Sequence, residues 1–427
     1  MPHTKYRHTL SFLLLSGIVL FSAASPVRAE GKFKLQPGAH GKICLTCHVE
    51  FSEKMKKKYI HTPLTQGECS GCNNPHTSSH AKLMAAGTDS ICYQCHDKLV
   101  PDQARSAHKV VQEGKCVACH DPHSSDNPAN LLEAGSKLCF TCHKELAEQI
   151  GKNKFKHAPV EKDCLGCHTP HASADNDQLL KTDVKSLCLK CHQTDKASFK
   201  ERHLNYPVEK SRCTSCHDPH GSSQGAILYD NVHQPIVNKM CNQCHNEPQS
   251  AEPLGLKKNG FELCQGCHYE MMNKTLNKKR MHWPLLDKTG CINCHTPHAS
   301  SVSGLLKKPM LTLCGSCHAD TISRQERSQT PHPPVAEGDC TACHSPHASD
   351  NLFFMNEAST VDVCGNCHDW QTHSTHPIGE KVLDPRNQNI TLQCMSCHRT
   401  HGTEYKHFMY FPDTQTLCVQ CHEKYRR

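Results

Sequence analysis

The chain has 427 residues, 36% of them apolar and only 5% aromatic, and its formal net charge is +7 at neutral pH. With a mean hydropathy of −0.62, it is too polar for a conventional hydrophobic core of that size, and it excludes a protein with several membrane spans. Cysteine and histidine are instead abundant, at 32 and 36 residues.

The N-terminus has the pattern of a secretory signal peptide. Lys5 and Arg7 precede an apolar run at residues 10–24, and a small-residue cleavage sequence ends at Ala29. The run of about 15 apolar residues is shorter than the roughly 20 that a transmembrane helix needs. We therefore expect residues 1–29 to be removed and the mature chain to be exported without a membrane span; an uncleaved anchor is the alternative.

All 32 cysteines form CxxC pairs, and fifteen of the sixteen pairs are followed directly by histidine. CxxCH is the attachment sequence of c-type haem, in which the thiols bond to the two vinyl groups and the histidine ligates the iron. Neither a disulfide framework nor paired zinc knuckles would require that histidine. The pairs are Cys44 and Cys47, Cys69 and Cys72, Cys92 and Cys95, Cys116 and Cys119, Cys139 and Cys142, Cys164 and Cys167, Cys188 and Cys191, Cys213 and Cys216, Cys241 and Cys244, Cys264 and Cys267, Cys291 and Cys294, Cys314 and Cys317, Cys340 and Cys343, Cys364 and Cys367, Cys394 and Cys397, and Cys418 and Cys421.

The fifteen histidines of these motifs are predicted to be the proximal iron ligands. They are His48, His96, His120, His143, His168, His192, His217, His245, His268, His295, His318, His344, His368, His398 and His422. The sequence thus predicts fifteen haem c groups and leaves a sixteenth open at Cys69 and Cys72. A segment of about 25 residues per motif buries little of itself, so we expect the haems to supply the apolar mass and the apoprotein to be largely unfolded.

The formal charge overstates how basic the holoprotein is. Loss of Lys5, Arg7 and Arg28 with the signal peptide reduces it to +4. Each haem adds two propionates, so fifteen haems bring roughly 30 negative charges. We therefore expect no binding to nucleic acid.

The motifs recur with a period of roughly 48 residues and are of two kinds. First-kind motifs usually follow an apolar residue, and their nine copies begin at Cys44, Cys92, Cys139, Cys188, Cys241, Cys264, Cys314, Cys364 and Cys418. Second-kind motifs continue as CHxPH or a close variant, and their seven copies begin at Cys69, Cys116, Cys164, Cys213, Cys291, Cys340 and Cys394. Apolar residues four apart after His143 and His268 predict short helices, and the polar runs after second-kind motifs predict loops. We therefore predict a multihaem cytochrome c fold, in which short α-helices and irregular loops surround a chain of covalent haems, with little β structure.

The period breaks between residues 221 and 263, where glycine and proline are frequent and an extra motif begins at Cys241. Eight motifs precede this break and eight begin at or after Cys241. We expect two haem-binding lobes, at residues 30–230 and 231–427; one continuous stack is the alternative.

The remaining histidines match the number of second, distal ligands that the irons need. Seven trail the second-kind motifs by three residues, and each is expected to ligate a neighbouring haem because it lies on the same side as its own proximal ligand. Seven more precede these motifs, and three precede first-kind motifs. The candidates are His40, His61, His76, His108, His123, His157, His171, His203, His220, His233, His282, His298, His332, His347, His376 (or His373 in its place), His401 and His407. Methionine ligands are not needed, so Met84 is interpreted as a packing residue.

Asn73 stands where the histidine stands in every other motif. Three interpretations are open: a decayed site without haem, a haem held on one side by another histidine such as His61, and a five-coordinate iron that binds a small ligand and is therefore catalytic.

The strings CHDPH at 119–123, CHTPH at 167–171 and CHSPH at 343–347 resemble the doubled-CxxCH multihaem cytochromes, which include periplasmic decahaem cytochromes of metal-respiring bacteria. The resemblance extends over the mature chain from Cys44 to His422. It implies bis-histidine haems in a chain-like array that carries electrons from an inner-membrane quinol oxidase to other cytochromes, terminal reductases or an outer-membrane porin conduit. Sixteen motifs, the break near residue 240 and Asn73 depart from the decahaem pattern.

The first functional hypothesis is an electron carrier of anaerobic or extracellular respiration, not an enzyme, located in the periplasm; association with the outer membrane or the cell surface is the alternative. The second is a reductase of a small oxyanion or nitrogen compound, with its open haem at Cys69 and Cys72. The third is a filament subunit whose terminal haems stack between copies.

Overall fold

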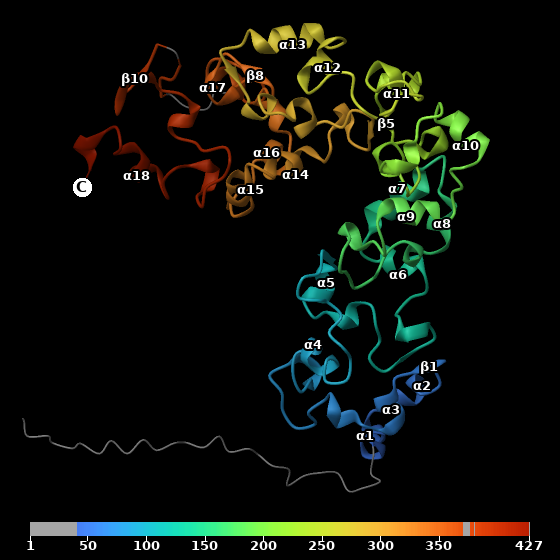
Figure 1. The fold of residues 1–427 in the computed structure, drawn as a ribbon. Coiled ribbons are helices and arrows are strands. Elements are labelled where there is room, and N and C mark those ends of the chain that lie inside the picture. Colours follow the sequence, from blue (N-terminus) through green and yellow to red (C-terminus); the bar gives the residue numbers. More distant parts are fainter. Residues whose placement is uncertain (1–40, 370–375, 380, 427) are drawn as a thin grey trace, which may run out of the picture. The chain divides into compact units, whose positions relative to one another are not determined.

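The computed structural model describes residues 41–369, 376–379 and 381–426 (Figure 1). These residues form short helices, 3₁₀ turns and two-stranded antiparallel ribbons, which confirms the predicted fold class. The α-helices are α1 (Lys42–Cys47), α2 (Phe51–Lys54), α3 (Thr62–Gln66), α4 (Thr88–Cys92), α5 (Lys109–Gln112), α6 (Ser136–Phe140), α7 (Lys144–Lys152), α8 (Ala158–Lys162), α9 (Val184–Leu189), α10 (Ala197–Arg202), α11 (Gln234–Val237), α12 (Phe261–Gln265), α13 (Tyr269–Leu276), α14 (Met310–Gly315), α15 (Ala319–Glu326), α16 (Pro333–Glu337), α17 (Thr360–Gly365) and α18 (Thr414–Cys418). The strands are β1 (Tyr59–Ile60), β2 (Ser106–Ala107), β3 (Ser124–Ser125), β4 (Ala172–Ser173), β5 (Asn231–Val232), β6 (Arg280–Met281), β7 (Ala299–Ser300), β8 (Ala348–Ser349), β9 (Leu383–Asp384) and β10 (Asn387–Thr391).

The two kinds of motif differ in their backbone. In the first kind, the first cysteine lies on an α-helix, as Cys139 does on α6. In the second kind, it begins or lies in a 3₁₀ turn, as Cys164 does. In both, the N–H of the following histidine donates to the carbonyl of the first cysteine, at 3.0 Å for His143 and 3.1 Å for His168. This bond holds the imidazole next to both thiols of its motif.

The motif at Cys241 belongs to the second kind, and the sequence-based assignment to the first kind is wrong. Cys241–Gln243 is a 3₁₀ turn, and His245 pairs with Leu256 in the same isolated β-bridge that joins His168 to Leu180. The apolar residue before Cys241 suggested the first kind. The backbone conformation of the motif instead depends on residues that follow it, because the chain turns back and Leu256 pairs with His245.

The two-residue strands connect successive repeats. Strand β2 pairs with β4, and β5–β7 and β6–β8 are equivalent ribbons further along the chain. Each ribbon joins the residues just before one leading histidine to the residues just after a trailing histidine of the next repeat. Accordingly, the N–H of His108 donates to the carbonyl of His171 at 2.9 Å.

The described residues divide into two compact units. One contains the residues up to Gly87 together with Asp121–Asn130, and the other contains Thr88–His120 and the residues from Leu131 onward. The β1–β3 ribbon lies inside the first unit. The lobes at residues 30–230 and 231–427 stay a prediction.

Few apolar side chains are buried in the described part of the chain. They are Ile91, Tyr206, Met272, Ala299, Ala348, Val361, Val363 and Leu392. Large apolar side chains are meanwhile exposed, including Trp283 at 64% and Phe353 at 80%. Burial of apolar area is the main favourable term in folding, so this polypeptide needs further apolar mass, and covalent haems fit that need.

The hairpin formed by β9 and β10 carries a buried ion pair. The side chain of Asp384 is 1% exposed, and its Oδ2 lies 2.6 Å from Nη2 of Arg386. The Arg386 guanidinium lowers the pKa of Asp384 to about 2. Because the carboxylate is buried, its charge depends mainly on this partner, with a smaller contribution from the Ser396 side chain.

Replacing Arg386 with glutamine is expected to destabilise the fold by about 3 kcal/mol at pH 7, because it leaves the buried carboxylate unpaired. The lowered pKa means that the pair stabilises the fold above the usual pKa of aspartate and that this contribution is lost as pH falls towards 2. Guanidinium unfolding of the holoprotein at pH 7 and pH 3 measures both effects. Arg105→Gln is the control: its ion pair with Asp177 is 62% and 63% exposed, so solvent screens it and a much smaller loss of stability is expected. Equal effects of the two substitutions would contradict the role of burial.

Candidate haem centres

Cysteines of consecutive motifs lie side by side. The first cysteine of a first-kind motif forms a thiol–thiol hydrogen bond with the first cysteine of the next second-kind motif. Burial and this neighbouring thiol raise the pKa of Cys139 to about 11 beside Cys164, and the pKa of Cys188 to about 11 beside Cys213. The observed pairs are Cys44 and Cys69, Cys139 and Cys164, Cys188 and Cys213, Cys264 and Cys291, Cys314 and Cys340, and Cys364 and Cys394.

Within the larger unit, the series continues from second-kind motifs to the motifs that follow them. Cys119 lies near Cys142, and Cys294 near Cys317. At the break in the period, Cys216 lies near Cys241 in the same way. Because each cysteine marks the edge of an attachment site, these consecutive sites adjoin one another.

Six proximal histidines of the second kind are oriented by a backbone carbonyl. Nδ1 of His168 lies 2.9 Å from the carbonyl oxygen of Gln178. With its proton on Nδ1, the ring donates to that oxygen and leaves Nε2 for the iron, which is the usual orientation of a metal-bound imidazole. The other contacts of this type join His217 to Ala226, His245 to Leu254, His295 to Gly304, His344 to Phe353 and His398 to His407, at 2.7–2.9 Å.

The accepting carbonyl usually belongs to a residue in the left-handed region of backbone space. Gln178 has φ 58°, Ala226 57° and Phe353 55°. This conformation costs a residue other than glycine about 1–2 kcal/mol. Its recurrence at one position of the repeat indicates that the orientation of the histidine determines the turn.

The leading histidines are oriented by the CHxPH string of the following second-kind motif. Nδ1 of His108 lies 3.1 Å from the carbonyl oxygen of Pro170, and that of His157 lies 2.8 Å from Pro219 O. His61, His233 and His282 make the same contact with Pro122, Pro297 and Pro346, respectively. In these five repeats, the proline of the second-kind motif thus fixes a leading imidazole. The motif at Cys394 reads CHRTH and has no such proline, and Nδ1 of His332 is buried without a hydrogen-bond partner among the described residues.

Twelve proximal histidines each face one distal candidate, with ring centres 5.9–6.3 Å apart. First-kind partners are His143 with His108, His192 with His157, His268 with His233, His318 with His282, His368 with His332, and His422 with His376. Second-kind partners are His120 with His171, His168 with His220, His217 with His203, His245 with His298, His295 with His347, and His344 with His401. In ten pairs the ring planes lie within 32° of each other, and they are steeper only for His203–His217, at 68°, and His376–His422, at 69°.

This separation fits two imidazoles on one iron. A metal–imidazole nitrogen bond is about 2 Å long, which places the ring centres on opposite sides of a shared metal about 6 Å apart. The pairing also follows a rule. A first-kind proximal histidine faces a leading histidine, and a second-kind proximal histidine faces the trailing histidine of the next second-kind motif.

The extra motif explains the exception to this rule. The string after Cys241 is CHNEP, which supplies no trailing histidine for His217. His203, a leading histidine, faces His217 instead, with the steep ring angle noted above.

Burial suits the trailing histidines to ligate a metal. It lowers the pKa of His171, His220, His298, His347 and His401. These imidazoles are therefore neutral at pH 7, which is the form that binds a metal.

The other candidates are placed as follows. His40 and the alternative His373 lie outside the described residues. Nδ1 of His61 meets Pro122 O at 2.9 Å, and His123 is half-buried with its ring 4.7 Å from that of Phe51. The side chain of His76 lies at an exposed position, and the carbonyl of His407 orients His398.

Sequence reasoning missed the carbonyls that orient the ligands. The proline of CHxPH was visible as a repeated residue. Nothing in the sequence identified Gln178, Ala226 or Phe353, because a carbonyl belongs to every residue and only the backbone conformation selects one of them.

Asn73 makes the same side-chain contact with a backbone carbonyl as the proximal histidines of other second-kind motifs. Its Nδ2 donates to the carbonyl of Lys82 at 3.2 Å, nine residues along the chain, and Lys82 has a left-handed φ of 57°. Asn73 also forms the isolated bridge with Met84 that other motifs form with leucine or methionine.

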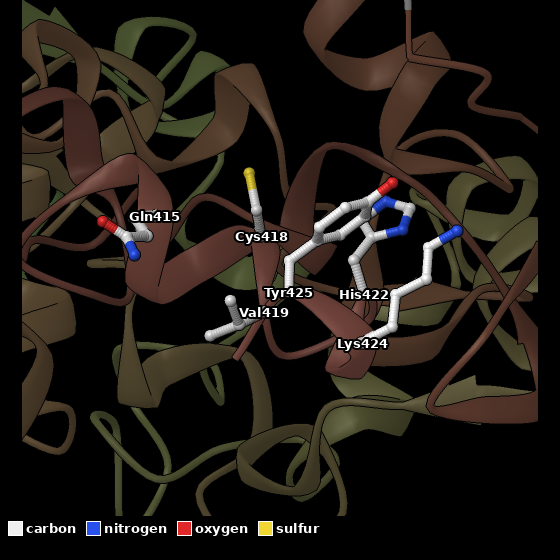
Figure 2. Close-up of a pocket in the computed structure, with 6 residues that line it drawn as sticks. All are labelled: Gln415, Cys418, Val419, His422, Lys424 and Tyr425. Carbon is white, nitrogen blue, oxygen red and sulfur yellow. The ribbon is translucent and has the colours of Figure 1, made fainter. Parts of the chain in front are cut away.

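The last motif borders an open cavity of about 480 Å³, shown in Figure 2. Cys418 and His422 line it together with Val419 and Tyr425. Gln415 and Lys424 complete its lining, so the thiol and the proximal imidazole border a space with both polar and apolar walls.

The chain belongs to the doubled CXXCH motif family. The family matches residues 61–101, 108–148, 157–197, 205–232, 233–273, 282–323, 332–373 and 388–427, which together are more than half of the chain. The protein is therefore a multihaem c-type cytochrome.

A segment of 101 residues is 27% identical to the multiheme cytochrome MtrA of Shewanella baltica. The match covers 22% of this chain and 27% of that protein, so the chain spans about a quarter of its relative. In the described part of the chain, no helix has the length and apolar character needed to span a bilayer.

The left-handed turn after each second-kind motif is open to a direct test at Gln178, whose side chain is exposed. Gln178→Val is expected to be less stable than Gln178→Gly by about 1–2 kcal/mol, because a β-branched residue resists positive φ. Thermal unfolding of the two holoproteins measures the difference. The control is exposed Gln149 in helix α7, where the order should reverse by a few tenths of a kcal/mol. The same order at both positions would contradict a strained turn.

Proposed function

We propose that the protein is an electron-transfer relay whose irons are mostly ligated by two histidines. The observation that carries this proposal is the set of twelve facing histidine pairs, in eleven of which the two imidazoles come from different motifs. Ligation of this kind ties each haem to its neighbours along the chain. Adjoining thiols such as Cys139 and Cys164 would hold the haems of consecutive motifs next to each other.

Six-coordinate irons suit electron transfer and not catalysis. With both axial positions filled, a substrate has no place to bind the metal. Histidine on both sides also keeps the reduction potential below that of a His/Met haem. The haems supply the redox chemistry, and this chain's residues position the haems and exclude other ligands.

The proposed ligand assignments follow the pairing rule. Histidines such as His108 and His171 would provide distal ligands for the haems of His143 and His120. For His108, the carbonyl of Pro170 keeps the proton on Nδ1. For the remaining proximal histidines, the assignment of a haem rests on their CxxCH motifs alone.

The proposed location is the periplasm, after removal of residues 1–29. Likeness to a multiheme cytochrome named MtrA supports a role between other redox proteins. We propose a quinol oxidase of the inner membrane as the electron donor and a further cytochrome, or a conduit through a porin, as the acceptor. Reduction of the purified holoprotein by such a quinol oxidase, and its reoxidation by a second cytochrome, would test the two ends separately.

The pairing rule makes a specific spectroscopic prediction. His171→Ala should convert one haem from low spin to high spin, because the haem of His120 loses its distal ligand. Electron paramagnetic resonance of the oxidised protein measures the change. His80→Ala, at an exposed position outside the pairing rule, should leave the spectrum unchanged.

A second variant shows which haem has changed. When Cys116 and Cys119 are both replaced by serine, the haem of His120 is absent, and His171→Ala should then add no high-spin iron. High-spin iron in that background would mean that His171 serves another haem and would overturn the rule.

A further inference from the structure

The Cys69–Cys72 motif has the backbone of a complete second-kind site. Cys69–Gly71 is a 3₁₀ turn, and the N–H of Asn73 donates to the carbonyl of Cys69 at 3.0 Å. The chain returns so that the N–H of Ala85 donates to the carbonyl of Cys72 at 2.9 Å. Lys181 and Cys167 make the same contact at the same distance in a repeat with histidine. The backbone hydrogen bonds of this motif are therefore those of a complete attachment site, which favours a bound haem over a decayed site.

The side chain of Asn73 occupies the inner half of the position of an imidazole. Its Nδ2 bonds to the carbonyl of Lys82, where other motifs place Nδ1 of histidine. Met84 Sδ lies 3.7 Å from the same nitrogen. An asparagine ends before the atoms that correspond to Cε1 and Nε2 of histidine. The hydrogen bond that orients a ligand is therefore kept, and the ligand atom is missing.

His123 is the expected distal histidine of this site, and it has the same backbone contacts as the trailing histidines of other repeats. The N–H of His61 donates to the carbonyl of His123 at 2.8 Å, and β1 pairs with β3 next to these residues. The corresponding contact between His108 and His171 accompanies the pairing of His171 with His120. By the same rule, position 73 is the partner of His123.

His123 is also fixed by contacts of its own. The ring of Phe51 on α2 packs against it edge-on, at 4.7 Å between ring centres and 87° between ring planes. Its N–H donates to Oδ1 of Asp121 at 2.9 Å, and Lys54 pairs with that carboxylate. The imidazole is therefore held in place although Asn73 supplies no second iron ligand.

We propose that the haem at Cys69 and Cys72 has His123 as its only protein axial ligand, and that its Asn73 face is an open position for a small uncharged ligand. The proposal rests on the proposed haem loading of the chain. Asn73 Nδ2 is committed to Lys82, so the amide oxygen is the polar atom that faces the vacated space. This site differs from the twelve observed histidine pairs, in which both faces are closed.

Carbon monoxide is the probe, because it binds ferrous haem only where a coordination position is open. Intact mass should show sixteen haems, and reduced holoprotein should bind carbon monoxide in an absorbance titration. Asn73→His should keep sixteen haems and bind one carbon monoxide fewer per chain. His168→Asn makes the same exchange at a site that faces His220, so it should add one carbon monoxide per chain.

Several outcomes would overturn the proposal. A mass of fifteen haems with unmodified Cys69 and Cys72 would show that this site is decayed. The proposed electron-transfer function would still stand in that case, because the other fifteen motifs would carry haem. Sixteen haems without carbon monoxide binding would show a filled sixth position; recovery of binding in Met84→Leu would then identify a methionine ligand. An unchanged carbon monoxide spectrum in His123→Ala would mean that another residue is the axial ligand. A chain without any haem would instead refute the proposed function itself.

Discussion

The structure depends on twelve pairs of imidazoles, eleven of which join different repeats. A ring separation close to 6 Å recurs in all twelve, with partners between 14 and 57 residues apart. Two imidazoles at this distance suit one metal between them and make little direct contact. The geometry therefore makes sense as a scaffold for cofactors, since the few buried apolar side chains could not by themselves hold the repeats together.

The hydrogen bonds around the imidazoles explain why the repeat has its form. Leading histidines such as His157 donate to the proline carbonyl of the next CHxPH string, and second-kind proximal histidines such as His168 donate to a left-handed turn. Each bond selects the tautomer that leaves Nε2 for a metal. The short ribbons, such as β2–β4, set the register that brings these partners together. The two-residue strands thus matter for alignment more than for the area that they bury.

Two irregular motifs show how the backbone of a second-kind site tolerates changes in sequence. The motif at Cys241 adds a site but no trailing histidine, and His203 takes the vacant place at a steeper ring angle. Asn73 removes the metal-binding atom and keeps the hydrogen bond to Lys82. The first change preserves a pair of imidazoles, whereas the second leaves one imidazole facing an amide. Both are local, because the backbone of a second-kind site forms without its full set of ligands.

The sequence by itself determined the chemistry, and the tertiary structure decided the pairing. CxxCH fixes the cofactor, its attachment and its proximal ligand within five residues, because these groups must be adjacent in the chain. Composition and spacing were also sufficient to predict short helices and loops. The partner of His120 could not be read from the sequence, since ribbons between repeats set the register that brings His171 to it. The Cys241 motif is likewise of the second kind only because Leu256, later in the chain, pairs with His245. The carbonyl of Gln178 orients a ligand only because the backbone of Gln178 is left-handed.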